Sequence, residues 1–101
     1  MSTRGDDVWV SAATIWEIEI KRSTNRLLAP ANPLQMVEDS GFERLPITLE
    51  HAVAAGRLPL HHRDPFDRML VAQARLEGLT LMTADATLSA YDVPVIEVPR
   101  P

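Results

Sequence analysis

The sequence predicts a single α/β domain over residues 1–101, with a parallel sheet flanked by helices. Short β-branched and aromatic runs alternate with longer stretches that carry apolar residues at helical spacing. This alternation is typical of a parallel sheet, because each helix returns the chain to the edge where the next strand begins. A chain of 101 residues can bury roughly 65% of its unfolded surface, enough for one modest core and too little for two domains.

Four residues with short polar side chains mark the expected starts of helices. Ser11, Asn32, Thr48 and Asp64 each precede a stretch with helical character, and such side chains accept hydrogen bonds from the free N–H groups of a first turn. Proline follows at the first helical position after both Asn32 and Asp64, where its missing N–H costs nothing.

The expected strands are short, and glycines separate them from preceding helices. Gly41 and Gly78 are typical helix stops, and each comes shortly before an apolar run. The final residues, 99–101, hold two prolines and should not pair in a sheet. The expected elements are a strand at 8–10, a helix from 12 to about 23, a helix from 33 to about 40, a strand at 42–47, a helix from 49 to about 56, a helix from 65 to 77, a strand at 79–83, a helical turn at 86–90 and a strand at 93–98.

Composition excludes several classes of function. The chain has no cysteine, so disulfides, thiolate zinc sites and cysteine nucleophiles are excluded, and a reducing, cytoplasmic location is expected. It has no signal-like start and no apolar stretch long enough to span a membrane. The net charge is −4, with a sequence pI near 5.2. The protein should therefore not bind nucleic acid through its overall field, and any RNA contact must be local.

Three carboxylates have positions that favour chemistry, and each also has an ordinary structural explanation. Glu17 lies in a mostly apolar stretch of helix, where an ion pair with Lys21 would equally account for it. Asp67 falls in the first turn of a helix, where an acidic residue complements the free N–H groups. Asp85 follows a predicted strand at the edge where ligands bind in open α/β sheets, but it could simply cap the turn after it.

A cluster of these carboxylates would require a cation. Three acids in one site repel each other unless protons or cations neutralise them, and hard oxygen ligands suit Mg²⁺ or Mn²⁺. Such an ion can activate a water molecule for attack on a phosphodiester. A zinc site at His61 and His62 is disfavoured, because adjacent residues rarely face one metal and His51 lies on another helix. No glycine-flanked serine elbow or glycine-rich phosphate loop is present in the sequence.

Three ordered motifs resemble those of the PIN-domain family, in particular VapC-type toxins of toxin–antitoxin systems. The motifs span nearly the whole chain in the family's order and spacing. They are Ser11-Ala12-Ala13-Thr14-Ile15-Trp16-Glu17-Ile18, the run from His61 through Asp64-Pro65-Phe66-Asp67-Arg68 to Ala74, and Leu81-Met82-Thr83-Ala84-Asp85.

The resemblance implies an endoribonuclease that cleaves RNA with Mg²⁺ or Mn²⁺ held by a small acidic cluster. By position, Glu17, Asp67 and Asp85 resemble the acids that bind the metal and carry catalysis, and Thr83 resembles a polar residue that supports them. Asp64 is expected to be a cap and not a ligand. The resemblance also implies a homodimer and a cognate antitoxin that inserts into the active-site groove.

The chain departs from the family at its amino terminus. Family members begin with a strand that ends in an aspartate and lies at the centre of the sheet, and this sequence starts after it. Its absence would leave two unpaired strand edges. Asp6 and Asp7 should not replace the missing acid, because they precede the strand at 8–10 and belong at its opposite, amino end.

Three explanations of this departure stay open. They are a start placed too late, a partner or swapped copy that closes the sheet, and a truncated relative that has lost activity. Two functions are therefore carried forward, which are a metal-dependent endoribonuclease and a catalytically inactive PIN domain that binds a partner protein or a second copy.

Overall fold

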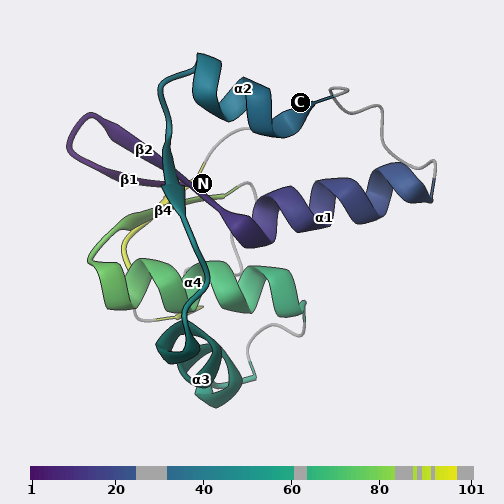
Figure 1. Cartoon of the computed structure of the whole chain (residues 1–101). Helices are drawn as coiled ribbons and strands as arrows, with labels where there is room; N and C mark the ends of the chain where they lie inside the picture. Colours follow the sequence, from purple (N-terminus) through teal and green to yellow (C-terminus); the bar gives the residue numbers. More distant parts are fainter. Residues whose placement is uncertain (25–31, 61–63, 84–87, 89, 92, 98–101) are drawn as a thin grey trace.

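The computed structural model describes residues 1–24, 32–60, 64–83, 88, 90, 91 and 93–97, and all statements below concern these residues. Strands and helices alternate along this part of the chain, and the expected α/β class is confirmed (Figure 1). Its elements are β1 (Ser2–Arg4), β2 (Asp7–Ser11), α1 (Ala12–Ser23), α2 (Pro33–Asp39), β3 (Glu43–Leu45), α3 (Leu49–Arg57), α4 (Pro65–Glu77), β4 (Thr80–Thr83) and β5 (Val95–Glu97).

The four predicted helix caps are confirmed. The side chain of each cap accepts a hydrogen bond from a backbone N–H of the first turn, as in Ser11 with Ala13 at 3.0 Å and Asp64 with Phe66 at 2.9 Å. Gly78 ends α4 with φ of 67°, the left-handed conformation that favours glycine. The helical turn predicted at 86–90 falls largely outside the described residues.

The sheet has the order β3-β2-β1-β4-β5. Pairing is parallel between β2 and β3 and between β4 and β5, as expected, but β1 is antiparallel to both of its neighbours. The expected parallel sheet is therefore mixed, and β1 occupies the central position where the sequence predicts a missing strand. The sequence does not predict a strand at Ser2–Arg4, because three polar residues carry no apolar alternation.

A tight turn explains why β1 runs antiparallel. Gly5 and Asp6 form the two-residue loop between β1 and β2, with Arg4 paired to Asp7. So short a loop can join only antiparallel strands, and its favoured turns need a positive φ, which Gly5 supplies at 59°. Residues Ser2–Arg4 of the chain itself thus form the strand between β2 and β4.

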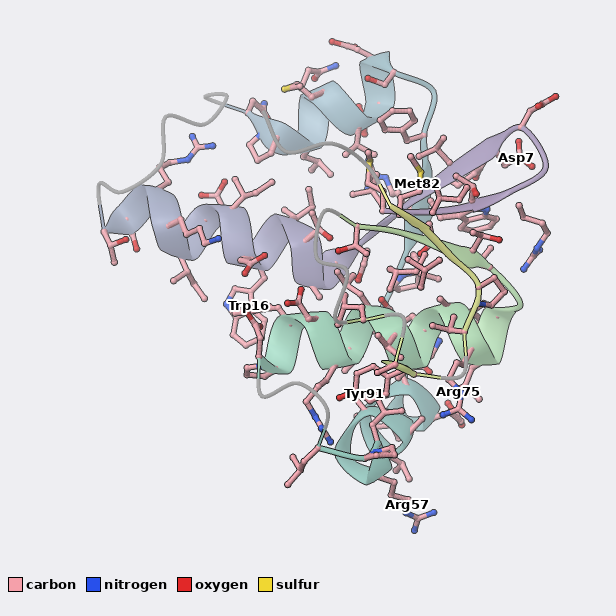
Figure 2. All side chains as sticks on the ribbon, turned by 180° about the vertical axis from the view of Figure 1, so that it is seen from behind. Asp7, Trp16, Arg57, Arg75, Met82 and Tyr91 are labelled. Atoms are coloured by element: carbon pink, nitrogen blue, oxygen red, sulfur yellow. The ribbon has the colours of Figure 1, made fainter. Side chains whose placement is uncertain are left out.

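Helix α4 is the most enclosed helix of the described chain. It lies between α1 and α3 and packs against β4 (Figures 1 and 2). Four consecutive residues, Val71 to Ala74, are buried, which requires neighbours on several sides. None of the described helices has the length and apolarity needed to cross a membrane. The main core cluster is formed by Leu45, Ala55, Leu58, Val71, Ala72, Ala74, Leu79, Leu81, Leu88 and Tyr91.

A buried histidine joins α3 to α4. The Nδ1 atom of His51 accepts a hydrogen bond from the backbone N–H of Thr48 at 3.0 Å, so the ring proton belongs on Nε2, which donates to a carboxylate oxygen of Glu77 at 2.8 Å. Gln73, also fully buried, directs its amide nitrogen to the same Nδ1 atom and to the carbonyl of Pro46. His51 is therefore a structural residue, and its place in the fold accounts for it without a metal.

Arg68 makes a second link between α3 and α4. Its guanidinium donates to the backbone carbonyls of Ala55 and Leu58, each at 2.9 Å, and to that of Pro59 at 3.2 Å. Ala55 lies in the last turn of α3, where its carbonyl also accepts from the Leu58 N–H at 3.4 Å, and Leu58 and Pro59 directly follow the helix. A cation at this end also complements the helix dipole.

Substitution of Gly5 should report on the hairpin that fills the sheet. A β-branched residue strongly disfavours positive φ, so Gly5→Val should lower the free energy of unfolding by roughly 1–2 kcal/mol. Gly5→Asn is the matched control and should cost less than about 0.5 kcal/mol, because asparagine tolerates this conformation. Urea unfolding followed by circular dichroism measures both variants. Equal stability of Gly5→Val and the parent would show that the turn does not form.

Loss of the buried imidazole should be costly. His51→Ala leaves the Thr48 N–H and the Gln73 amide without their partner in a dry environment, and should lower the free energy of unfolding by about 2–3 kcal/mol. The exposed neighbour on the same helix provides the control, since Ala52→Ser should change stability by less than about 0.5 kcal/mol. Equilibrium urea titration distinguishes the two, and similar values for both variants would contradict the assigned network.

Candidate functional site

The carboxyl ends of four strands, β2, β3, β4 and β5, lie along the same edge of the sheet, which is called the carboxyl edge below. Because β1 is antiparallel to both β2 and β4, those two strands run in the same direction, and β3 and β5 follow them. The same edge receives the amino end of β1, so Met1 lies where α1 begins (Figure 1). Helix α4 leads into β4 through a short turn at Gly78 and runs back along the sheet, which brings its first turn to this edge as well.

Glu17 lies in the middle of α1 and is partly buried. Its carboxylate is 3.6 Å from the ammonium of Lys21, one helical turn away. The ion pair with Lys21, which by itself would account for Glu17, is therefore formed. The Lys21 side chain is 54% exposed, and an ion pair of that kind is worth only about 0.3–0.5 kcal/mol, so it holds the carboxylate weakly.

Asp67 is the third residue of α4 and is also partly buried. Capping does not account for it, because the side chain of Asp64 accepts hydrogen bonds from the N–H groups of both Phe66 and Asp67. The expectation that Asp64 is a cap is thus confirmed. Asp67 therefore needs an explanation other than capping.

Helices α1 and α4 bring these two acids to the same side of the domain. The rings of Trp16 and Phe66 meet edge to face, with centroids 5.0 Å apart and planes inclined at 73° (Figure 2 labels Trp16). Glu17 and Asp67 are the next residues along their respective helices. An aromatic contact therefore fixes the two helices together directly beside the predicted acids.

The remaining residues of the predicted site are less fully defined. Thr83 is partly buried at the end of β4, so it lies at the expected edge. Asp85 falls outside the described residues. His61 and His62 do as well, so the structure does not address the zinc site that the sequence disfavours.

The α-amino group of Met1 also lies at this edge of the sheet, although the sequence alone does not point to it. Its carbonyl accepts a hydrogen bond from the N–H of Met82 at 2.8 Å, which holds the residue at the carboxyl end of β4. Burial lowers the pKa of its α-amino group below the ordinary value, while the charge of Asp67 offsets part of that shift. The α-amino group of Met1 thus lies near enough to Asp67 for the two groups to interact electrostatically.

Arg4 fixes the other end of β1. Its guanidinium donates to the carbonyl of Glu77 in the last turn of α4 and lies 5.8 Å from the centre of the Trp9 ring. Helix α4 consequently interacts with both ends of β1, through Asp67 at one end and Glu77 at the other. Asp7 starts β2 at the tip of the hairpin, away from α1 (Figure 2), which confirms that it cannot replace a missing acid.

The donor atoms of Glu17 and Asp67 have the right chemistry for a divalent cation. Hard ions such as Mg²⁺ and Mn²⁺ prefer carboxylate oxygens. Among the described residues, however, no group of three acidic or histidine side chains is close enough to hold a metal ion. At the central strand the residue beside this edge is Met1, whose side chain carries no oxygen ligand.

Comparison with known families agrees with this arrangement. The model of the PIN domain matches residues 2–94, well over half of the chain. Comparison with curated proteins and with solved structures returns no match. The five-stranded sheet with helices packed around it is consistent with the family's fold. The chain therefore belongs to the PIN-domain family, whose fold is in general that of a nuclease.

Proposed function

We propose that this protein is a metal-dependent endoribonuclease of the VapC type, the toxin of a type II toxin–antitoxin pair that acts in the cytoplasm. The observation that carries the proposal is the contact between α1 and α4, in which Trp16 and Phe66 touch and are directly followed by Glu17 and Asp67, with the first turn of α4 beside the carboxyl edge of the sheet. Ligands bind at this edge in open α/β folds.

Glu17, Asp67 and Asp85 are the residues that would hold Mg²⁺ or Mn²⁺. When bound, such an ion activates water and offsets the charge that develops on a phosphodiester during attack. The weak contact between Glu17 and Lys21 leaves that carboxylate able to turn toward a cation. With Asp64 serving as the helix cap, Asp67 is not required for capping.

The RNA substrate must approach through local contacts. The chain carries a net charge of −4, so its overall field repels a polyanion. A bound divalent ion would lower this repulsion at the site itself. The proposed activity should therefore depend steeply on the metal ion concentration.

Asp67→Asn should abolish cleavage of a structured RNA in Mn²⁺. The amide keeps the size of the side chain but removes its charge, so activity should fall at least about 100-fold. Asp7→Asn is the matched control, because Asp7 is exposed at the opposite end of the sheet, and it should cut as the parent does. Cleavage should also stop in EDTA.

Two further measurements separate chemistry from folding and contamination. Circular dichroism should show the same unfolding midpoint for Asp67→Asn and Asp7→Asn, and calorimetric titration with Mn²⁺ should show weaker binding only for Asp67→Asn. An Asp67→Asn variant that cuts RNA as fast as the parent would refute the assigned role. Absence of cleavage by the parent at any metal concentration would favour the second candidate.

The second candidate function is binding of a partner protein without catalysis. An apolar groove of about 480 Å³ runs between α1, α2 and β3, and a smaller hollow of about 160 Å³ adjoins it through shared residues. Trp16 is 60% exposed and Leu34 47% exposed in the groove wall, so apolar surface is left uncovered. The groove is lined by Val10, Ala12, Ile15, Trp16, Leu34, Val37, Arg44, Leu45 and Pro46.

An amphipathic helix of a cognate antitoxin is the proposed occupant of this groove. Its apolar face would cover Trp16 and Leu34, since helices recognise such grooves through apolar anchors at helical spacing. Arg44, the one charged residue of the wall, already pairs with Glu38 and would leave the groove essentially apolar. A partner bound there would lie beside Glu17, on the same helix as Trp16.

Helical peptides selected for binding to the parent chain should depend on this groove. Leu34→Asp introduces a charge into the wall and should weaken their binding at least about 10-fold. Leu60→Asp is the control, because Leu60 is 79% exposed outside the groove, and it should leave the affinity unchanged. Fluorescence anisotropy with labelled peptides measures both variants, and equal binding to the two would rule out this surface.

A further inference from the structure

The indole ring of Trp16 is the aromatic surface that this domain leaves open to solvent. Its side chain is 60% exposed, whereas the other four aromatic residues of the chain, all of which the structure describes, are buried or half-buried. Trp16 is not an isolated apolar residue, because it also forms part of the wall of the groove between α1, α2 and β3. An exposed ring in such a groove is a candidate contact for a ligand.

The ring is already held in place within the free protein. Its edge-to-face contact with Phe66, with centroids 5.0 Å apart, ties it to the first turn of α4. One contact of this geometry covers only part of an indole, and the exposed fraction shows that the rest stays open. A ring with a fixed position loses little conformational freedom when a ligand stacks on it.

The open ring lies beside the acids of the candidate site. Trp16 directly precedes Glu17 on α1, and Phe66 directly precedes Asp67 on α4. Figure 2 shows Trp16 between α1 and the start of α4. A flat group stacked on this ring would therefore lie next to the helix contact that carries both carboxylates.

Stacking is a contact that suits an acidic protein which must hold RNA. The chain has a net charge of −4, and the candidate site adds the carboxylates of Glu17 and Asp67, so attraction to phosphate groups is weak there. A base that stacks on an aromatic ring needs no positive charge for its affinity. An open indole next to the acids provides such a contact where the electrostatic field does not.

We propose that Trp16 stacks against an unpaired base of the RNA and so places the neighbouring phosphodiester beside Glu17 and Asp67. The inference rests on the proposed ribonuclease function and defines the substrate of that site as RNA with an unpaired nucleotide next to the cleaved bond. Bases inside a duplex already stack on their neighbours, so a duplex has no free base face to offer to the ring.

The emission of Trp16 measures this contact without any cleavage. Trp9→Phe removes the only other indole, so the remaining tryptophan fluorescence comes from Trp16. In EDTA, a short single-stranded RNA with one purine among uridines should quench this emission. Its Kd should be at least about 10-fold lower than that of the same strand annealed to its complement. Labelled RNA and fluorescence anisotropy repeat the comparison on the parent chain.

Substitutions of Trp16 separate stacking from simple apolar contact. Trp16→Leu keeps an apolar side chain but removes the ring, so it should raise the Kd for the single strand about 10-fold, and Trp16→Phe should restore most of the affinity. The loss should be the same at low and high salt, because stacking is not an ionic contact. Leu60→Ala, an exposed apolar residue outside the groove, should leave the Kd unchanged.

Cleavage tests the second half of the proposal. At RNA concentrations below saturation, Trp16→Leu should lower the rate of cleavage in Mn²⁺ by about the same 10-fold factor. Asp67→Asn should instead lose cleavage and keep the affinity of the parent for the single strand in EDTA. Matching unfolding midpoints by circular dichroism exclude misfolding of any variant.

Three outcomes would overturn the proposal. They are equal binding of single-stranded and duplex RNA, equal affinity of Trp16→Leu and the parent, and RNA that leaves the Trp16 emission unchanged while a helical peptide quenches it. The last outcome would assign the ring to the second candidate function. A parent chain that binds the single strand through Trp16 but never cleaves it would support the stacking contact and refute the nuclease activity.

Discussion

Hydrogen bonding in the middle of the sheet is the constraint on which the rest of this structure depends. Strands β2 and β4 are both interior, and each needs a neighbour for the backbone groups that it turns toward the other. Residues Ser2–Arg4 supply that neighbour by folding back through a two-residue turn. Without them the sheet would divide into two pairs, and the helices that pack on it would have no common surface.

Because the central strand β1 is antiparallel to β2 and β4, the charged groups near the carboxyl edge of the sheet differ from those that a parallel strand would place there. A parallel strand in this position would end at the edge, whereas β1 begins there and brings the α-amino group of Met1 toward Asp67. The same topology places Arg4 at the opposite edge, against the last turn of α4. The direction of β1 thus decides which end of the strand, and therefore which ionisable group, lies near Asp67.

Helix α4 and its cap contain, within a few positions, residues that hold the fold together and one acid of the candidate site. Asp64 caps it, Arg68 holds the carbonyls at the end of α3, and Gln73 reaches the buried ring of His51. Asp67 lies among these residues, and the cap of the helix is supplied by Asp64 in its place. The motif from Asp64 to Ala74 is therefore mainly a structural unit that positions one acid. This explains why the motif is so distinct in the sequence.

The sequence alone determined the helices, their caps and the α/β class, because these depend on local spacing and on side chains next to a helix end. It also singled out Asp67 and Thr83, which lie at the carboxyl edge of the sheet, and Glu17, which lies in the middle of α1. Only the tertiary structure decided what fills the centre of the sheet, since Ser2–Arg4 has no strand pattern of its own and is stabilised by the two strands beside it. The interaction of Met1 with Asp67 and the exposed apolar side chains of α3 were likewise beyond reach from the sequence. Both arise where segments distant in the chain meet, and local patterns carry no information about such contacts.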